Sequence, residues 1–336
     1  MGQTKAAVEL TVLIVGAGIG GLTAAIALRR AGHHVELFDS TPGPSEIGAA
    51  INICYNADVV LRRLGVNVAD AGGVRMERLR LVKASGELLQ DQDFLKNSQA
   101  FLKDSHQYQS EYRLTLRAAL HGQLREVATS NEGHGPPAKV SYGRSVASVD
   151  AETATISFTD GSSIAGEWHR PADKSELLEI FSEFEPKVLA MLEKADPKSL
   201  RVYPLFDMDT LPSFISPTGR LALLGDAAHP FLPHLAQGGA MAIEDGVALG
   251  VMMSQLESFD EVPERLKLYN EARYERATRI QEYTRIVGGD SVKSDENSAA
   301  KLSLNEYMQY PYPHDEQLAS EAILHKYLES KQTAVY

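Results

Sequence analysis

The chain has 336 residues, of which 43% are hydrophobic and 23% are charged, enough for one large domain or two smaller domains that share a core. Acidic residues outnumber basic residues by 45 to 33, and Lys and Arg gather on no single segment, so we expect no nucleic-acid partner. The single cysteine cannot form an internal disulfide, and every apolar run is far shorter than the roughly 20 residues that span a bilayer, so we expect a cytoplasmic chain without a membrane anchor.

The first elements along the chain predict a βαβ unit. Residues 8–15 form a nearly continuous apolar run, which predicts a central strand buried on both faces of a parallel sheet. Residues 22–30 have alanines at helical spacing and predict a helix, and residues 34–38 predict a second strand that ends at Asp39. The expected fold class is therefore α/β, with a Rossmann-like domain around a central parallel sheet.

The middle of the chain alternates between helical and β-rich patterns. Residues 57–64 and residues 114–127 each predict a helix with a buried face. Three short β-rich runs between residues 139 and 158 predict a small antiparallel sheet. Residues 176–191 predict a helix that Pro186 bends or divides, with an apolar stripe used for packing.

The last third of the chain is predicted to be mainly helical. Residues 220–224 predict one more short buried strand. Helices are predicted over residues 240–253 and 262–285. The tail from residue 301 is predicted to be helical over residues 316–330, and the pattern does not assign it a place in the fold.

The GAGIGG segment between the first strand and the first helix has the spacing of a dinucleotide site. Gly16 permits a tight turn, Gly18 lets the backbone approach a pyrophosphate, and Gly21 lets the helix pack closely on the strand. The N-terminus of that helix offers unpaired N–H groups and a partial positive charge to the phosphates. Asp39 would accept hydrogen bonds from the adenosine ribose and disfavours a 2′-phosphate there. The alternative, Glu36, lies inside its strand and not at its end.

A second motif indicates which dinucleotide is bound. Residues 221–230 read LALLGDAAHP, and they are followed by Pro233 and by QGGAMAIED over residues 237–245. With EIGAAI at residues 46–51 and RAALH at residues 117–121, this pattern resembles the flavin-dependent aromatic hydroxylases, the family that includes salicylate and 4-hydroxybenzoate hydroxylases.

The resemblance implies an enzyme with bound FAD and with NAD(P)H as a transient electron donor. It implies hydroxylation of a small aromatic substrate, phenolic or polyketide-like, by O2 through a flavin C4a-hydroperoxide. The protein would supply binding, orientation and exclusion of water. Beside the glycine-rich turn, the candidate cofactor-binding residues are Gly48, Ala49, Arg117, Asp226, Pro233, Gly238 and Gly239.

Five of these candidates have a stated chemical role. Asp226 follows a predicted strand and would bind the ribityl hydroxyls, unless it merely caps a turn. Gly238 and Gly239 open a helix whose N–H groups would stabilise the reduced flavin. Pro233 would shape the pocket wall. Arg117 resembles the family arginine at the cofactor, and its alternative is a solvated position on a helix face.

Other polar side chains near these motifs are expected to be structural. His229 and His234 are not assigned as catalytic bases, because a flavin hydroxylase takes its reactive oxygen from the cofactor. Glu244 and Asp245 are adjacent on a helix and are expected to point apart, into capping or packing roles. Cys54 is expected to be an inert small hydrophobe, and no metal site or catalytic residue is assigned.

The chain departs from the family after the predicted antiparallel sheet. In the family an extensive sheet forms the substrate pocket, whereas here residues 164–171 lead directly into a helical segment. We therefore predict an FAD-binding domain over residues 1–165 and 218–290, a shortened, helical substrate region over residues 166–217, and a partly helical tail over residues 291–336.

Two functions are compatible with these patterns. The first is an FAD-dependent monooxygenase, and the second is a catalytically impaired or uncoupled flavin-binding protein derived from the same family. A flavin halogenase is disfavoured because Trp168 is the only tryptophan, and a simple NAD dehydrogenase would not need the motif at residues 225–230. Without the substrate sheet, exposed apolar surface would favour a homo-oligomer.

Overall fold

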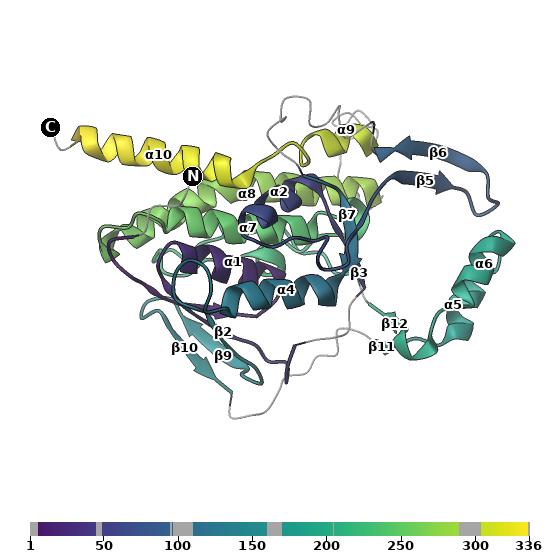
Figure 1. Ribbon diagram of the computed structural model, residues 1–336, viewed down its shortest axis with the longest axis horizontal. Coiled ribbons are helices and arrows are strands. Elements are labelled where there is room, and N and C mark those ends of the chain that lie inside the picture. The colour runs from purple at the N-terminus through teal and green to yellow at the C-terminus, as the bar shows by residue number, and fades with distance from the viewer. Residues whose placement is uncertain are drawn as a thin grey trace. The chain divides into compact units, whose positions relative to one another are not determined.

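The computed structural model describes residues 6–44, 49–94, 96, 110–159, 170–203, 205–288 and 304–334. The chain forms two compact units (Figure 1), of which unit 1 comprises Met1–Arg75, Ser105–Ser163 and Asp207–Tyr336, and unit 2 comprises Met76–Asp104 and Ile164–Phe206. The units thus group residues 76–104 with most of the predicted substrate region. No helix among the described residues is both long and apolar enough to cross a membrane.

Unit 1 contains a three-stranded parallel sheet with the order β1-β2-β8. Its strands are β1 (Thr11–Val15), β2 (His34–Phe38) and β8 (Lys139–Ser141). β1 and β2 pair in parallel along their full length, and α1 (Ile19–Arg30) connects them, which confirms the predicted βαβ unit and the α/β fold class. A hairpin of β9 (Val146–Asp150) and β10 (Thr155–Phe158) follows β8. The prediction of one antiparallel sheet over residues 139–158 is wrong for its first run, because β8 pairs with β2.

The central strand β1 is less buried than its sequence predicts. Only Ile14 is fully buried, while Leu13 is 36% exposed and Val15 is 54% exposed. β1 lies at the edge of the sheet in the described part of the chain. Residues 220–224 do not form the predicted strand. Those residues make a single antiparallel bridge, between Ala222 and Ile215.

A second sheet in unit 1 has the order β3-β7-β4 and is antiparallel. Its strands are β3 (Ala50–Ile53), β7 (Arg113–Leu116) and β4 (Val74–Arg75). Helix α4 (Arg117–Thr129) begins directly after β7. The helix predicted from residue 114 therefore starts later than expected, because residues 113–116 pair with two other strands.

Helices form most of the rest of unit 1. They are α2 (Tyr55–Arg63), α7 (Gly238–Met252), α8 (Val262–Gly288), α9 (Leu304–Gln309) and α10 (Glu316–Ala334). α7 packs against α1, α2, α8 and α10, and it is buried on every side after its first turn. Close approach of α1 requires a small residue, because a Cβ atom on Gly250 would lie 2.3 Å from the Cβ of Ala27.

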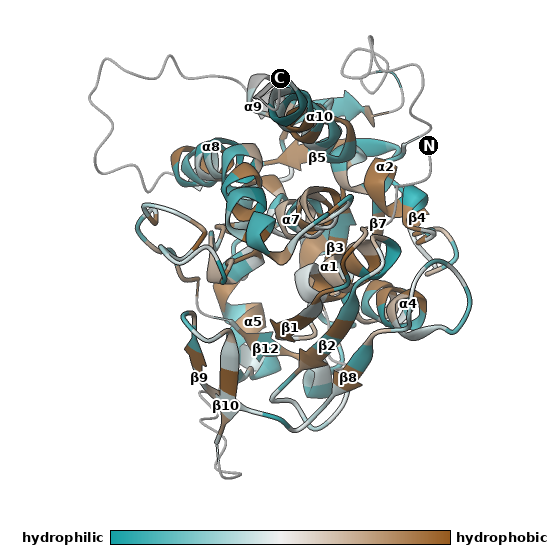
Figure 2. Ribbon diagram, turned by 90° about the vertical axis from the view of Figure 1, so that its left-hand side faces the viewer, coloured by the Kyte–Doolittle hydropathy of each residue, from teal (hydrophilic) through white to brown (hydrophobic). Residues whose placement is uncertain are grey.

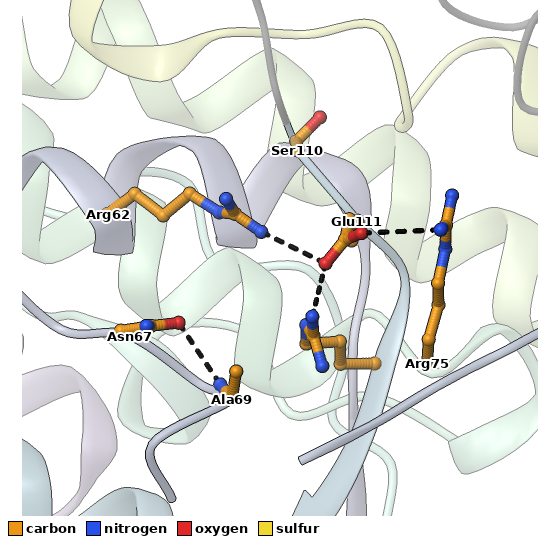
Figure 3. Close-up of a pocket in the computed structure, with 7 residues that line it drawn as sticks. Arg62, Asn67, Ala69, Arg75, Ser110 and Glu111 are labelled. Carbon is orange, nitrogen blue, oxygen red and sulfur yellow. Dashed lines mark hydrogen bonds and ion pairs between the residues drawn. The ribbon is translucent and has the colours of Figure 1, made fainter.

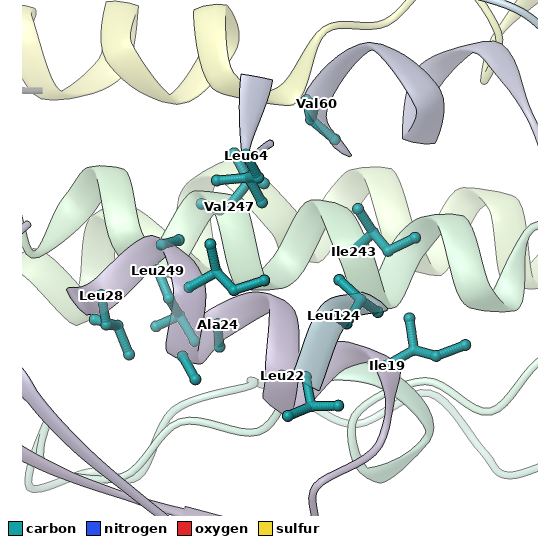
Figure 4. Packing of buried hydrophobic residues seen from close by; sticks show 14 of the residues in the cluster. Ile19, Leu22, Ala24, Leu28, Val60, Leu64, Leu124, Ile243, Val247 and Leu249 are labelled. Carbon is teal, nitrogen blue, oxygen red and sulfur yellow. The ribbon is translucent and has the colours of Figure 1, made fainter. Parts of the chain in front are cut away.

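The hydrophobic core lies around α1 and α7. Figure 4 shows Leu22 and Leu28 of α1 near Ile243 and Leu249 of α7, with Leu124 of α4 completing the cluster. In Figure 2, β1 is largely brown, whereas α8 mixes brown with teal because one side of this helix faces solvent. This packing fixes the first turns of α1 and α7, which carry the two predicted cofactor motifs.

The C-terminal tail, which the sequence did not place, packs on this core. α10 contacts α7, α8 and α2. Immediately before it, Asp315 accepts a two-pronged hydrogen bond from Arg63 at the end of α2 (2.5 and 2.8 Å). Such paired contacts are geometrically specific, so the tail is joined to unit 1 by charge as well as by apolar contacts.

Unit 2 is small and consists of short elements. They are β5 (Arg78–Val82), β6 (Leu88–Asp93), β11 (Arg170–Pro171), α5 (Lys174–Ile180), α6 (Pro186–Leu192), the 3-10 turn η1 (Pro197–Ser199) and β12 (Arg201–Val202). β5 and β6 form an antiparallel hairpin, and β11 pairs with β12. The predicted division of the helix at Pro186 is confirmed, since α6 begins at that residue.

Many apolar side chains of unit 2 are exposed, and most of the others are only half-buried. α5 and α6 contain no fully buried residue, but Leu177 of α5 and Val188 of α6 are half-buried, so the predicted packing of their apolar stripe is partial. Among the described residues of this unit, Phe94 is the one buried hydrophobic side chain. The large exposed hydrophobic residues are Leu81, Val82, Leu88, Leu89, Ile180, Met191, Val202, Tyr203, Leu205 and Phe206. A two-stranded hairpin and two short helices offer too little surface to cover them.

Candidate flavin site

The glycine-rich turn connects β1 to α1 in the way a dinucleotide site requires. Gly16 has φ +99°, and its N–H donates to the Phe38 carbonyl at the end of β2 (2.8 Å). A Cβ atom on Gly21 would lie 2.1 Å from the Gly16 carbonyl oxygen, so only glycine allows this turn to fold onto the helix. Among the described residues, no atom lies within 4 Å of a Cβ atom built on Gly16 or Gly18, so the outer side of the turn has room for a ligand.

The first turn of α1 has the electrostatic character of an anion site. Gly18 precedes the helix, no side chain caps it, and no acidic residue lies in the first turn. The unpaired N–H groups and the positive end of the helix dipole are therefore available to a phosphate group.

Asp39 lies at the end of β2 and is bound to the glycine-rich turn. Its Oδ2 accepts a hydrogen bond from the Ala17 N–H (2.8 Å), and its Oδ1 accepts bonds from the Thr41 N–H (2.9 Å) and hydroxyl (2.5 Å). Burial alone would raise the pKa of Asp39, but these hydrogen bonds outweigh it and lower the pKa, so the carboxylate is ionised. The alternative, Glu36, instead pairs with Lys139 (3.2 Å).

One residue near this turn has a contact that the sequence did not indicate. His121 of α4 donates a hydrogen bond from Nε2 to the Ala17 carbonyl (2.7 Å). Ala17 is therefore held on both sides, because its N–H group binds Asp39. The charge of His121 also contributes to the lowered pKa of Asp39. His121 belongs to the RAALH segment quoted for the family resemblance, but only the folded chain shows which residue it contacts.

The second motif forms a short 3-10 turn, η2 (Gly225–Ala227), with Asp226 at its exposed corner. The Asp226 carboxylate has no hydrogen-bond partner among the described residues, so the alternative of a turn cap has no supporting contact. The turn is held in place by the buried Asp245 of α7. Its Oδ2 accepts hydrogen bonds from the Gly225 N–H (2.8 Å) and from His229 Nε2 (2.7 Å).

The start of α7 is also uncapped. Gln237 precedes the helix without a side-chain hydrogen bond to it, and Gly238 and Gly239 form the first turn, which holds no acidic residue. Pro233 begins the preceding 3-10 turn η3 (Pro233–Leu235) and is exposed. This arrangement allows N–H groups of α7 to bind a ligand, as predicted for the flavin edge.

The structure brings several of the predicted cofactor residues together. The Arg117 N–H donates to the Ala49 carbonyl (3.1 Å), which joins these two candidates, and the Arg117 side chain is exposed. A Cβ atom on Gly239 would lie 2.8 Å from Ile51, so α7 starts against β3, two residues from Ala49. The first helix also lies close to the second motif, because a Cβ atom on Gly20 of α1 would lie 2.6 Å from the side chain of Leu224. Gly48 lies outside the described residues.

A buried charge network lies behind the second motif. Arg273 of α8 contacts Glu244 (2.7 Å), Asp245 (2.8 Å) and Glu316, and all four side chains are fully buried. The expectation that Glu244 and Asp245 point apart is therefore wrong, because one guanidinium bridges them. Arg276 adds two contacts to Glu244 (2.7 and 2.8 Å). The two arginines are spaced by three residues on a polar helix, a pattern compatible with ordinary solvent exposure, so the sequence did not single them out.

The pKa values of this network are strongly shifted. Burial would raise the pKa of Glu244, but Arg276 and Arg273 hold it well below its usual range. Burial would likewise raise the pKa of Asp245, and His229 and Arg273 lower it. Ligand atoms of Glu244, Glu316 and His314 lie within 4.8 Å of one another, but the two guanidinium groups already neutralise these carboxylates, which argues against a bound cation.

Two side chains expected to be structural have matching environments. His229 is 1% exposed and bound to Asp245, so it does not face a substrate. Cys54 is buried, and burial raises the pKa of its thiol to about 12, as expected of an inert small hydrophobe. His234, by contrast, is exposed.

Together, the βαβ unit, the open glycine-rich turn, the two uncapped helix starts and the unpartnered Asp226 define a dinucleotide-binding α/β protein that fits FAD. Residues 14–52 match a family described as NAD(P)-binding Rossmann-like domain, and residues 216–284 match one described as FAD binding domain.

Comparison with known proteins extends this result to the whole chain. The aurachin C monooxygenase/isomerase of Stigmatella aurantiaca is 30% identical over 334 residues, covering 80% of this chain and 86% of that protein. The FAD-dependent monooxygenase cfoG of Aspergillus candidus is 27% identical over 408 residues, covering 92% of this chain and 91% of that protein. The fold is similar to a salicylate hydroxylase substrate complex (TM-score 0.68, 18% identity, 94% of this chain and 98% of that chain).

The chain belongs to the FAD-dependent aromatic hydroxylases, a family of flavin monooxygenases, and is thus an FAD-binding oxidoreductase. NAD(P)H is the electron donor typical of this family. The alignment with cfoG is 408 positions long and the present chain has 336 residues, so that relative contains sequence without a counterpart here.

Proposed function

We propose that this monooxygenase acts on a small phenolic or polyketide-like aromatic compound, with NAD(P)H as electron donor and O2 as oxidant. Salicylate, after which one protein of similar fold is named, is a phenol of this kind. Bound FAD supplies the redox chemistry, and the chain's own residues bind and orient the cofactor.

The proposed roles of the cofactor residues follow from their geometry. The open turn at Gly16 and Gly18 would receive the pyrophosphate, because it leaves room for a ligand beside the uncapped start of α1. The ionised Asp39 would accept hydrogen bonds from the adenosine ribose. The unpartnered Asp226 would bind the ribityl hydroxyls, and Arg117 would contact the cofactor beside Ala49.

The exposed apolar residues of unit 2 bear on how well the reaction is coupled. A hydroxylase must keep its substrate and the activated oxygen away from water, or the reducing equivalents are released as hydrogen peroxide. Unit 2 contains one buried hydrophobic residue among those described, and no residue of its two helices is fully buried. We therefore propose slow, largely uncoupled turnover for the chain alone, and this observation favours the impaired-binder alternative over an efficient hydroxylase.

The same exposed residues would favour self-association, since exposed apolar patches of this kind commonly mark protein contacts. Light scattering of the purified protein at several concentrations tests this expectation. A monomer at all concentrations would contradict it.

One experiment tests the proposed function. The protein is purified, its visible spectrum is recorded, and NADH and NADPH are added in air and under argon while flavin bleaching, O2 uptake and peroxide are measured. We expect a yellow protein whose NAD(P)H oxidation yields mainly peroxide in the presence of phenolic compounds. A protein that stays colourless with added FAD would refute flavin binding, and tight coupling to a hydroxylated product would refute the impaired-binder alternative.

A further inference from the structure

A polar cavity of about 470 Å³ lies in unit 1 away from the cofactor motifs. It is lined by residues from the end of α2 and the following loop, from β4, and from the start of β7 (Figure 3). Its volume is within the range of small-molecule sites, about 300–1,000 Å³. The cavity lies at the Arg113 end of β7, whereas the cofactor candidate Arg117 follows the opposite end of that strand.

Three arginines converge on one carboxylate in this cavity. Arg62 (3.2 Å), Arg75 (3.5 Å) and Arg113 each contact Glu111, as the dashed lines in Figure 3 show for the first two. The arginine side chains are 33%, 49% and 17% exposed, so their guanidinium groups reach the cavity without being fully covered. Several of their N–H donors are therefore available to a ligand, since each guanidinium offers five.

The local charge is positive in an otherwise acidic protein. The formal charge of the chain is −12, yet this cavity is lined by three arginines and one carboxylate, the half-buried Glu111. A further carboxylate, Asp58, is buried beside Arg62 and accepts a hydrogen bond from its Nε (2.7 Å). Even with Asp58 ionised, the cluster has more positive than negative groups.

Glu111 occupies the place among the three arginines that a bound anion would take. Burial would raise its pKa, but hydrogen bonding to Arg113 and the charges of Arg75 and Arg62 lower it, so the carboxylate is ionised. Several guanidinium groups around one oxyanion are an arrangement that also suits phosphate, because guanidinium forms paired hydrogen bonds with both groups.

We propose that the cavity bounded by Arg62, Arg75 and Arg113 is a second anion site, which binds a phosphoryl group of a small molecule in competition with Glu111. The phosphoryl group could belong to free pyrophosphate or to the 2′-phosphate of NADPH. The second source rests on the proposed use of NAD(P)H, whereas the first does not.

The test uses the FAD-loaded protein, so that the glycine-rich turn is already occupied. Calorimetric titration with pyrophosphate, NADPH and NADH distinguishes the two sources, because NADH lacks the 2′-phosphate. In Arg75→Glu we expect binding of the phosphoryl probe to weaken by at least about tenfold, since a charge-assisted contact is replaced by repulsion. Arg75 is the most exposed of the three arginines and has the longest contact, so the substitution should leave the fold intact.

Arg279→Glu is the matched control. Arg279 is 44% exposed and pairs with a single carboxylate, Glu275, on the surface of α8. Its substitution changes the net charge equally and should leave probe affinity within about twofold. Equal loss in this control would overturn the proposal, because it would show a general charge effect.

Glu111→Gln gives a second, opposite test. If Glu111 competes with the ligand, this neutral variant binds the phosphoryl probe at least about threefold more tightly than the native chain. If the three arginines serve only to fix β7, the variant gains no affinity, and that result overturns the proposal. The proposal would also be overturned if the native, FAD-loaded protein bound neither pyrophosphate nor NADPH, and that result would not affect the evidence for FAD.

Discussion

Arg273 connects the helix that follows the second motif to the C-terminal tail, so its replacement tests whether this charge network stabilises the fold. Replacing Arg273 with methionine keeps a long side chain but removes the charge that neutralises Glu244, Asp245 and Glu316. Removing one partner of a buried ion pair typically destabilises a protein by about 3–5 kcal/mol. We expect a loss of about 3 kcal/mol at pH 7.5, the lower end of that range, because each carboxylate retains another partner.

The remaining partners are specific to each carboxylate. Glu244 keeps Arg276, Asp245 keeps His229, and Glu316 keeps hydrogen bonds from His314 (2.9 Å) and Ser320 (2.7 Å). Asp245 would, however, lose its ion pair with Arg273. This matters for the cofactor site because Asp245 also holds the η2 turn through the Gly225 N–H. FAD affinity should therefore fall together with stability.

In Arg273→Met, the free energy of unfolding should depend on pH with the opposite sign from that of the native chain. In the native chain the folded-state pKa values of Glu244 and Asp245 are lowered, so their stabilisation is present above the unfolded values of about 4 and is lost as pH falls through the folded values. Without Arg273 these folded-state pKa values rise, and proton uptake relieves the buried charge. The stability difference between the two proteins should then shrink as pH falls from 7.5 to 5.

Urea denaturation at both pH values, with and without saturating FAD, measures these differences. Arg279→Met is the control, because its exposed pair with Glu275 should change stability by less than about 0.5 kcal/mol. A loss below about 1 kcal/mol for Arg273→Met at pH 7.5, or a difference that widens at pH 5, would refute the account of the network.

Three further predictions concern single residues. Asp226→Ala should weaken FAD binding about 10- to 150-fold in a fluorescence titration, because a charge-assisted hydrogen bond is lost; unchanged affinity would mean that Asp226 does not bind the cofactor. Gly21→Ala should abolish FAD retention and lower the melting temperature, because its Cβ would lie 2.1 Å from the Gly16 carbonyl oxygen, and a fully loaded variant would contradict that geometry. Cys54, with its pKa raised to about 12, should resist iodoacetamide at pH 8 until the chain unfolds; mass spectrometry of the native protein would detect any labelling.

Features that depend on local sequence were predictable. The boundaries of β2 agree with the prediction, and α1 and α7 begin within a few residues of the predicted starts, because apolar periodicity and glycine positions are local signals. The division at Pro186 follows equally from local chemistry, since proline cannot continue the preceding helix.

Features that depend on distant partners were not predictable. Residues 114–116 are predicted to be helical but belong to β7, because β3 and β4 pair with this strand. β8 joins β2, about 100 residues earlier in the chain, although its own sequence resembles a hairpin strand. The contacts of Arg273 likewise reach α7 and the start of α10, so no spacing rule on α8 could identify them.

Cofactor binding and substrate enclosure are proposed to involve different parts of this chain. The elements proposed to bind FAD belong to unit 1, where α1 and α7 share a continuous core and Asp245 fixes the turn that carries Asp226. The predicted substrate region lies mostly in unit 2, which has many exposed apolar side chains. A substitution in unit 2, such as Ile180→Ser, should therefore alter self-association or the coupling of NAD(P)H oxidation to hydroxylation without changing FAD affinity. Arg273→Met, by contrast, should lower FAD affinity. If both substitutions reduced FAD affinity alike, the two functions could not be assigned to separate parts of the chain.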